Sequence, residues 1–597
     1  MKSGVAPASL LSRGVSQSRR AADRRTDANP MQRLSLPEQA LWVCLVLGLV
    51  LWKTHFGTAP LVFSDSFQYF SVAEHVREGR YGWTSIINFD AERSFGAVPA
   101  PMITLSPGYG VLTGLVSLGG LAVERGAALV SCVATLLSLL VLGWIGVLQG
   151  LPRRWIRLVL AAFALNSFVL KYASAAMSEA LFGLLAIMGL ALLIRSLVPR
   201  VPRRGSWVLA LLSGLSLGAS YWVRSPGVFL VVGLCVLTLM ICIERGPRAS
   251  LRHVVASTVA IATVALGMAR NVSIAGDWRG GETKAVSHGV LEVLGRTRTT
   301  LDDLMLGSVP LADSIGLHLL FVLSLAFATL VAWRGYVAWR RTTCEPSGAG
   351  RFGRLEIVLL GGSYIVCCVY AGFFTVLPYG PRLLAPAIPF VLLLGAGLAT
   401  EYGQAGDNQN WLRWPVRIAI AMAIGSYGWL NLSWFRAVPS LSDPHALAQR
   451  LGAPAVGGGT LADMVIKTAG PDGVVVATEA ATTGYLLGLP VIALAPTESS
   501  ETLWDEAQTR AVVRRFGARV LLVNAPPVGS DPALTLPSLF LAGLLRGEAP
   551  AWLEPAGRSA HVAVYRVRLN GSYASTSDVP RERPNSQPRS NAIISTK

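Results

Sequence analysis

Long apolar segments recur along most of this chain and limit what it can fold into. The first is ALWVCLVLGLVLW, at 40–52. Further segments of spanning length centre near 127–149, 157–170, 180–196, 207–222, 227–243, 252–270, 316–333, 355–375, 383–399 and 415–431. A helix needs roughly 20 apolar residues to cross a bilayer. Because 52% of the 597 residues are hydrophobic and only 14% are charged, we predict a mainly α-helical, polytopic membrane protein.

The positive charge of the chain falls largely between these segments. The net charge is +18, which in a soluble protein would suggest nucleic-acid binding. In membrane proteins, however, Lys and Arg accumulate in cytoplasmic loops, so the excess needs no anionic partner. We therefore expect no nucleic acid among the partners.

The segment SPGYGVLTGLVSLGGLAV, at 106–123, decides the topology. It is apolar, but Pro and Gly interrupt it. If it does not cross, the later arginine-rich loops lie on the cytoplasmic side with the N-terminal tail. If it crosses, those loops lie outside, against the positive-inside bias. We predict that 106–123 is re-entrant or interfacial, which leaves about eleven spans, with the N-terminus inside and the C-terminus outside.

Composition divides the chain into four parts. We predict a disordered basic cytoplasmic tail at 1–36 and a transmembrane module at 37–435, whose first external loop is 54–126. Short apolar runs between helical patterns predict a small external α/β domain at 436–567. Its predicted strands are 474–478, 491–495, 520–524 and 561–567. The polar residues 568–597 are predicted to be disordered, and the seven cysteines show no metal-ligand spacing.

The stretch SDSFQYFSVAEHVREGRYGWTS, which follows the first span, predicts a short amphipathic helix in the membrane interface. Its apolar residues recur at helical spacing: Phe67, Phe70, Ala73 and Val76. Asp65 lies in the first turn, where free N–H groups and the helix dipole favour an ionised carboxylate. One interpretation is that Asp65 and Gln68 form only a capping box. The other gives Asp65 a chemical role.

Other ionisable residues fall on the same predicted face of the membrane. Such residues are costly at membrane depth and suggest function. They are Lys171, Glu179, Arg224 and Arg382. A carboxylate that deprotonates a hydroxyl, beside cations that hold a phosphate, suits glycosyl transfer from a lipid-phosphate sugar. Taken singly, each side chain also fits an interfacial, snorkelling or capping role.

Four motifs resemble the GT-C class of polytopic glycosyltransferases, and most closely the branch with protein O-mannosyltransferases and the lipid A aminoarabinose transferase. They are SDSFQYFSVAEHVREGRYGWTS, TLSPGYGVLTGL, AAMSEALFGLL and PYGPRLLAPAIPFVLLL, within residues 40–435. They are similar to the family's first external loop, its interfacial helix, its second external loop and its late arginine motif. The resemblance implies that a sugar moves from a polyprenyl-phosphate donor to an acceptor hydroxyl on the external, periplasmic face, with inversion.

The resemblance also implies roles for individual residues. Asp65 would be the catalytic base, and Glu179 would position the acceptor or a cation. The donor phosphate would be bound by Arg382, Arg224 and Lys171, and the sugar or acceptor would face Tyr69 and Tyr109. Several relatives have two adjacent acidic residues where this chain has Asp65 followed by Ser66. A lone carboxylate is a poor Mg²⁺ or Mn²⁺ site, so we expect no cofactor, with a divalent cation as the open alternative.

Three other functions stay open at this point. A transporter or lipid flippase would place its ionisable residues near the bilayer midplane, a scaffold would use the α/β domain only for binding, and a polymerase or ligase for lipid-linked glycans would take a larger substrate. The acceptor is a lipid, a glycan or a protein. The uncleaved first span fits a bacterial inner membrane or an endoplasmic reticulum. The resemblance and the absence of retention signals favour the bacterial membrane.

Overall fold

The computed structural model describes residues 36–54, 60–87, 94, 96–199, 201–280, 288–306, 353–373, 380–405, 427–429, 431–436, 451–452, 460–494, 504–525, 538–559 and 561–568. The predicted tails at 1–36 and 568–597 lie outside these residues except for residues 36 and 568. The predicted span at 316–333 and most of the one at 415–431 also lie outside them.

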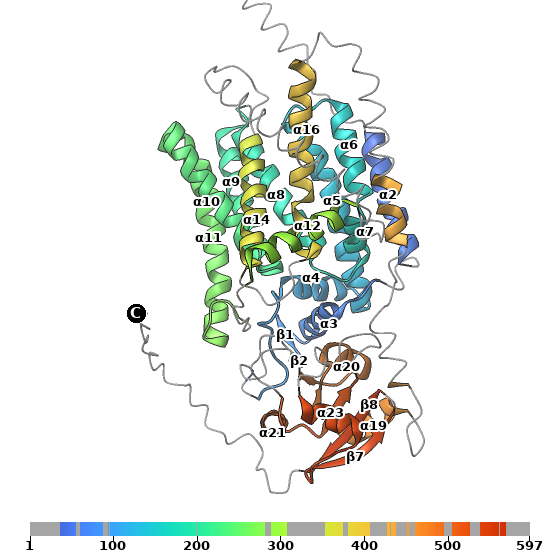
Figure 1. Ribbon diagram of the computed structural model, residues 1–597. Coiled ribbons are helices and arrows are strands. Elements are labelled where there is room, and N and C mark those ends of the chain that lie inside the picture. Colours follow the sequence, from blue (N-terminus) through green and yellow to red (C-terminus); the bar gives the residue numbers. More distant parts are fainter. Residues whose placement is uncertain are drawn as a thin grey trace, which may run out of the picture.

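A bundle of long helices forms the larger part of the molecule (Figure 1). It contains α2 (Leu36–Lys53), α5 (Val123–Leu148), α6 (Arg153–Ala164), α7 (Ser167–Ser174), α8 (Glu179–Leu197), α9 (Arg203–Val223), α10 (Gly227–Arg245), α11 (Pro247–Ala275), α14 (Arg354–Ala371), α15 (Pro381–Leu384), the 3-10 helix η3 (Ala385–Ala387) and α16 (Ile388–Ala405). In the described part of the chain, seven helices are long and apolar enough to cross a membrane, or up to eight if a bent pair is one span. The predicted fold class, a polytopic helical membrane protein, is confirmed.

The predicted span at 157–170 is not a single straight helix. α6 and α7 meet at an angle of 56°. The side chain of Asn166 causes the break, because its Oδ1 accepts hydrogen bonds from the backbone N–H groups of Phe168 and Val169, at 3.0 and 3.1 Å. Asparagine is a preferred N-cap residue, so α7 starts as a separate helix.

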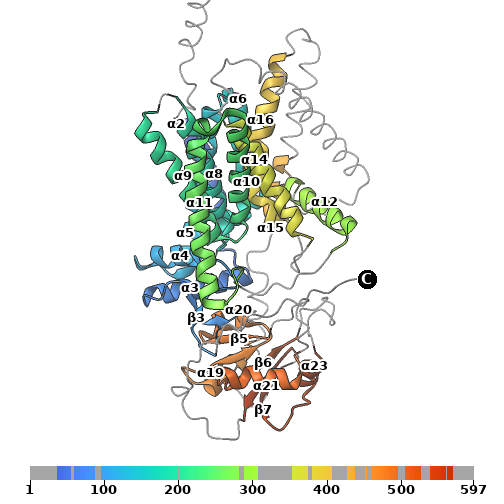
Figure 2. The same cartoon turned by 90° about the vertical axis from the view of Figure 1, so that its left-hand side faces the viewer.

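Two shorter helices, α3 (Ser64–Arg77) and α4 (Gly108–Ser117), lie across one end of the bundle (Figures 1 and 2). With ten residues, α4 is about 15 Å long, too short to cross a membrane. The segment at 106–123 therefore does not span, as predicted. Small residues let the two helices pack closely, since a Cβ on Gly114 would lie 2.6 Å from the Cβ of Val76.

The amphipathic helix predicted for the interface is α3, but its surroundings differ from the prediction. Its residues from Ser66 to Ala73 are all buried, as are His75 and Val76. One side packs on α4, and another packs on α20 (Ala480–Leu487) of the C-terminal part of the chain. A helix covered by protein on both sides cannot lie with a free apolar face in lipid.

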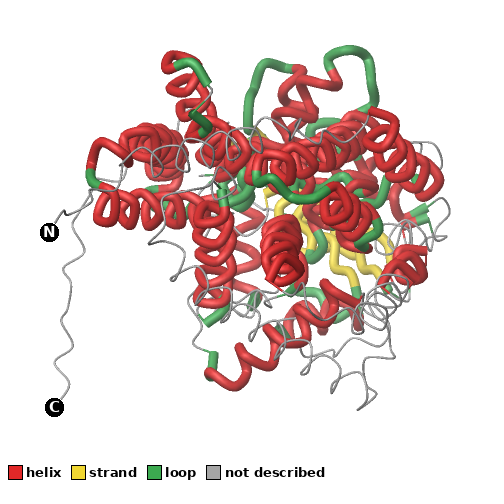
Figure 3. The backbone as a smooth tube through the Cα atoms, turned by 90° about the horizontal axis from the view of Figure 1, so that it is seen from above, coloured by secondary structure: helices red, strands yellow, loops and turns green. Residues whose placement is uncertain are grey.

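A small α/β domain adjoins that end of the bundle (Figures 1 and 2), and its strands lie beneath the helices in the view from above (Figure 3). Its sheet has the order β2-β5-β4-β6-β8-β7. The strands are β2 (Ile86–Ile87), β4 (Val475–Ala477), β5 (Val491–Ala493), β6 (Val520–Asn524), β7 (Leu553–Arg558) and β8 (Val562–Val567). β2, β5, β4 and β6 are parallel, whereas β8 and β7 are antiparallel to their neighbours. One face packs on α19 (Leu461–Ala469) and α20, and the other on α21 (Glu506–Arg515) and α23 (Leu539–Arg546).

Several elements of the structure have no counterpart in the sequence prediction. β2 comes from the first external loop, so the sheet is not built from residues 436–567 alone. β7, in LEPAGR, includes a proline and a glycine, both unfavourable in strands. Helix α12 (Val290–Leu306) lies between the predicted spans at 252–270 and 316–333, where no helix was predicted. A separate two-stranded ribbon joins β1 (Trp83–Thr84) to β3 (Ala100–Pro101).

Candidate active site

A short backbone pairing fixes where α3 begins. The N–H of Leu61 donates to the carbonyl of Ser174, and the N–H of Ala176 donates to the carbonyl of Leu61, each at 2.9 Å. This pairing ties the chain just before α3 to the chain just before α8. The first turn of α3, with Asp65, therefore lies beside the first residue of α8, which is Glu179.

Asp65 does not cap its helix. The N-cap position is Phe63, and the hydroxyl of Ser66 accepts a hydrogen bond from the Phe63 backbone N–H at 3.0 Å. Gln68 makes no part of this arrangement. Ser66 satisfies the helix end, so the carboxylate of Asp65 is left to pair with a side chain from a distant part of the chain.

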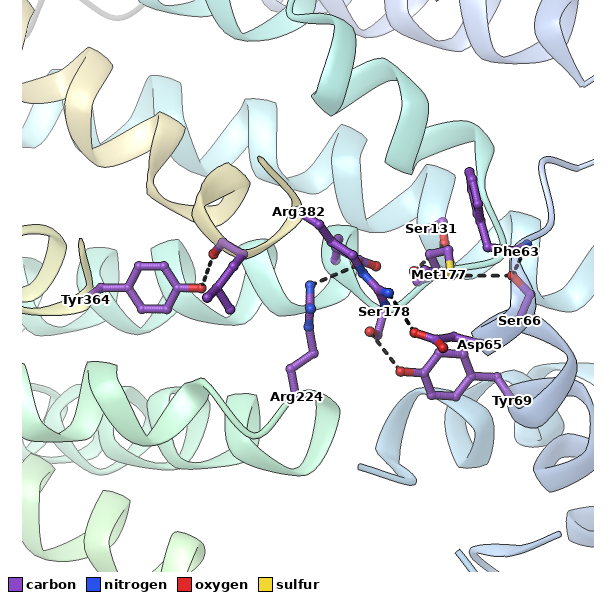
Figure 4. Close-up of polar contacts among 12 residues, drawn as sticks. Phe63, Asp65, Ser66, Tyr69, Ser131, Met177, Ser178, Arg224, Tyr364 and Arg382 are labelled. Atoms are coloured by element: carbon purple, nitrogen blue, oxygen red, sulfur yellow. Dashed lines mark hydrogen bonds and ion pairs between the residues drawn. The ribbon is translucent and has the colours of Figure 1, made fainter. Parts of the chain in front are cut away.

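That partner is Arg382, which bridges two carboxylates (Figure 4). Its Nη1 lies 2.7 Å from Oδ2 of Asp65, and its Nε donates to Oε1 of Glu179. Nη1 of Arg224 lies 2.9 Å from the same oxygen of Glu179. This contact is an ion pair without the geometry of a hydrogen bond. Two carboxylates and two guanidinium groups thus form one ion-pair cluster.

The four residues of the cluster differ in exposure. The side chain of Glu179 is 2% exposed and that of Arg224 is 14% exposed, whereas those of Asp65 and Arg382 are 21% and 37% exposed. The inner pair is therefore nearly closed off, and the outer pair remains accessible. A guanidinium carries five N–H groups, so Arg382 can hold both carboxylates and still present N–H groups to a third anion.

Helix α15 holds Arg382 in place. The helix begins after Gly380 with Pro381 in its first turn, where a fixed φ suits a helix start. The hydroxyl of Tyr364, on α14, donates to the backbone carbonyl of Leu383 at 2.7 Å. Because Tyr364 is itself buried, it anchors the backbone beside Arg382 to the bundle (Figure 4).

Lys171, on α7, lies among aromatic rings near the cluster. Its Nζ is 4.9 Å from the ring centre of Phe63, 5.5 Å from that of Trp434 and 5.7 Å from that of Tyr172. Ring faces attract a cation at these distances. Sequence reasoning missed Phe63 and Trp434, since no spacing in the sequence relates them to Lys171.

The two predicted sugar-facing tyrosines occupy different places. The hydroxyl of Tyr69 donates to Oγ of Ser178, next to Glu179, at 3.1 Å. Burial and the nearby carboxylate of Asp65 raise the pKa of Tyr69 to about 12. Tyr109 is 0% exposed and donates to the carbonyl of Ala127 at 2.9 Å. This enclosed position does not fit the predicted role of Tyr109 as a sugar-facing residue.

An apolar pocket within the bundle reaches Glu179. It lies among α5, α6, α7, α8 and the start of α16. Phe163, Phe168, Ile187 and Pro386 are among its lining residues. The cluster therefore has an aqueous side, where Arg382 is exposed, and an apolar side within the membrane-spanning helices.

The carboxylates of the cluster are paired with guanidinium groups. Within the described ranges, no three or more His, Cys, Asp or Glu side chains come together as a metal ion would require. Asp65 and Glu179 do approach each other, but the guanidinium of Arg382 lies between them. The positive charge between the two carboxylates is thus that of Arg382.

Comparisons with known proteins place this fold in a class. No family model matches the sequence, and no curated protein matches it. Among solved structures, ArnT from Cupriavidus metallidurans in the apo state is similar with a TM-score of 0.52 and 13% identity, over 88% of this chain and 97% of that one. ArnT bound to undecaprenyl phosphate gives a TM-score of 0.52 and 13% identity, over 90% and 100% of the two chains.

An oligosaccharyltransferase is also similar. The Archaeoglobus fulgidus enzyme in complex with Zn and sulfate has a TM-score of 0.52 and 9% identity, over 82% of this chain and 68% of that one. At these identities the likeness is one of fold. The chain has the fold of the GT-C membrane glycosyltransferases, as the four motifs led us to expect.

Proposed function

We propose that this protein is a membrane glycosyltransferase that moves a sugar from a polyprenyl-phosphate donor to an acceptor hydroxyl. The observation that carries the proposal is the cluster of Asp65, Glu179, Arg224 and Arg382, which lies at the end of a GT-C fold and adjoins an apolar pocket. Cations beside an apolar pocket suit a lipid phosphate, and an exposed carboxylate suits an acceptor hydroxyl. The similar ArnT structure was solved with undecaprenyl phosphate.

In this proposal the donor phosphate binds at Arg382 and Arg224, and its isoprenoid chain enters the pocket that Phe163, Phe168 and Ile187 line. Lys171 lies near enough to contribute positive charge. Arginine binds phosphate oxygens in a bidentate manner, which fixes the direction of the leaving group. When the phosphate arrives, it competes with Asp65 for Arg382 and so releases the Asp65 carboxylate.

Asp65 then acts as the base. It accepts the proton of the acceptor hydroxyl while that oxygen attacks the anomeric carbon, and the bond from that carbon to the phosphate oxygen breaks. Attack from the side opposite the leaving group inverts the configuration. Arg382 and Arg224 stabilise the negative charge that develops on the departing lipid phosphate. Glu179 orients both guanidinium groups from its buried position.

We further propose that the reaction needs no metal ion, because Arg382 supplies the cation between the two carboxylates. For the orientation, the start of α9 (Arg203, Arg204) and the ends of α8 (Arg195) and α10 (Arg245) lie at the end of the bundle opposite the cluster. By the positive-inside rule that end faces the cytoplasm. The cluster and the α/β domain then face the periplasm of a bacterial inner membrane.

The test is transfer of radiolabelled sugar from a panel of polyprenyl-phosphate monosaccharides, with cell-envelope lipid, glycan and protein fractions as acceptors. We expect transfer from one donor, with product of inverted configuration, and no loss of rate in the presence of EDTA. Arg382→Lys keeps the charge but not the bidentate geometry, and should raise the KM for the donor. Arg157→Lys, in an exposed ion pair with Glu38, is the matched control and should change nothing.

Two outcomes would contradict the proposal. If folded protein transfers no sugar from any donor, a transporter or a scaffold becomes the better explanation. If EDTA abolishes transfer and Mg²⁺ or Mn²⁺ restores it, the enzyme class survives, but the role given to Arg382 as the bridging cation is wrong.

A further inference from the structure

The α/β domain contacts the helix that carries Asp65 at two separate places. The first is the sheet itself. β2, from the first external loop, pairs in parallel with β5 of the C-terminal part of the chain, and the N–H of Val491 donates to the carbonyl of Ser85 at 3.0 Å. Ile86 and Ile87 are both buried, one on each face of the sheet. The sheet therefore holds the first loop by backbone pairing and by two apolar anchors.

Ser85 passes this attachment on to α3. Its backbone N–H donates to Oγ of Ser71 at 2.8 Å, and its own Oγ lies 2.8 Å from Nε2 of His75. Ser71 and His75 are buried residues of α3, and four residues apart they share one face of the helix. The segment 85–87 is thus hydrogen-bonded both to the domain and, through Ser85, to α3.

The second place is Tyr485, near the end of α20. Its ring centre lies 4.8 Å from that of Phe67 and 5.6 Å from that of Phe70, both on α3. Its hydroxyl donates to Oε1 of Glu124, in the first turn of α5, at 2.6 Å. Burial and the Glu124 carboxylate raise the pKa of this hydroxyl, so it remains a donor at neutral pH. One side chain thus joins the domain to α3 and to the bundle.

Phe67 follows Asp65 by two residues and is 1% exposed. Its packing fixes the rotation and position of the first turn of α3. General-base catalysis depends on where the base lies, and an error of about 1 Å can cost roughly 100-fold in rate. The donor-binding arginines, by contrast, lie on α15 and at the end of α9. Although Arg382 pairs with Asp65, the backbone beside it is anchored to the bundle by Tyr364.

We propose that the C-terminal α/β domain positions the catalytic base, and that Tyr485 is the main positioning residue of this contact. The inference rests on the proposed function, because it assigns the domain a part in that same site. It predicts a separation of effects. Loosening Tyr485 should lower kcat, which depends on Asp65, and should leave the affinity for polyprenyl phosphate unchanged, since Arg382 and Arg224 are held by the bundle.

The experiment compares Tyr485→Ala and Tyr485→Phe in the full-length protein. We expect Tyr485→Ala to lower kcat about 10-fold or more, with the Kd for undecaprenyl phosphate within about twofold of wild type. Tyr485→Phe keeps the ring contacts with Phe67 and Phe70 and should recover most of the rate. Tyr565→Phe is the matched control: its buried hydroxyl donates to the carbonyl of Leu544, on the opposite face of the sheet, so kcat should not change.

A second readout separates this inference from the proposed function. Hydrogen exchange of the α3 amides measures the contact without any sugar donor. We expect those amides to exchange about 10-fold faster or more in Tyr485→Ala than in wild type, with α8 and α9 unchanged. Unchanged α3 exchange would overturn the positioning role even if transfer is lost. A rise in the Kd for undecaprenyl phosphate that equals the loss of kcat would also overturn it.

Discussion

Glu179→Gln tests the buried half of the ion-pair cluster. The substitution keeps the size of the side chain and removes a charge that is 2% exposed and pairs with both arginines. Arg224, 14% exposed, would then lack its carboxylate. Breaking a buried pair costs about 3–5 kcal/mol because one charge stays buried and unpaired. Arg382 keeps its ion pair with Asp65 and is 37% exposed. Losing the second pair, between Arg382 and Glu179, therefore adds only about 0–1 kcal/mol to the cost.

The glutamine oxygen can still accept a hydrogen bond, which offsets about 1 kcal/mol. We therefore expect a decrease of about 2–5 kcal/mol in the free energy of unfolding, measured by SDS titration in mixed micelles. The double variant Glu179→Gln/Arg224→Gln removes both charges and should recover about half or more of that loss. The reasoning that these charges are buried and compensate each other would be refuted by either of two results. One is a single variant with the same free energy of unfolding as wild type; the other is a double variant less stable than the single one.

Three further predictions concern packing, pH and metal. Gly114→Val would place a Cβ 2.6 Å from that of Val76. It should cost about 1–3 kcal/mol in the unfolding titration and lower transfer, although no residue of the cluster is changed. Gly119→Val should be tolerated, because a Cβ at Gly119 would lie at an ordinary contact distance of 3.7 Å from the carbonyl oxygen of Val116. Burial and the Asp65 carboxylate raise the pKa of Tyr69 from 10.0 to about 12, so above pH 10 the unfolded chain loses this proton first. The free energy of unfolding should therefore fall between pH 10 and pH 12, by up to about 1.4 kcal/mol per pH unit, and less steeply in Tyr69→Phe; equal slopes would contradict this. Dialysis against EDTA should leave the melting temperature and the transfer rate unchanged, and a drop in either that Mg²⁺ reverses would show that a metal ion is bound.

The charged residues of the site could be predicted from the sequence, because the bilayer makes each ionisable residue near a span conspicuous. Asp65, Glu179, Arg224 and Arg382 are far apart in the chain, yet topology alone assigned them to one face, and the structure brings them together. Topology could not predict which carboxylate pairs with which arginine. That Arg382 bridges Asp65 and Glu179 depends on α15, which Tyr364 anchors from another helix.

The aromatic residues were harder to assign, because apolar rings look alike in a hydrophobic sequence. Tyr109 follows a proline and a glycine in a motif similar to the family's interfacial helix, yet its hydroxyl is hydrogen-bonded to Ala127 and Ser131. The start of α7 did have a signal, since Asn166 before Ser167 is a typical N-cap. Strand β2 has almost no signal in the sequence, because two residues are too few to show an alternating pattern.

The central claim is that Asp65 is the base of a sugar transfer from a polyprenyl phosphate, and the most direct measurement is the single-turnover rate of Asp65→Asn with bound donor. General-base catalysis contributes about 10²–10⁴-fold, so the rate should fall by that factor while the Kd for undecaprenyl phosphate stays within a fewfold of wild type. A rate within about tenfold of wild type would contradict the claim, since asparagine cannot accept the proton from the acceptor hydroxyl.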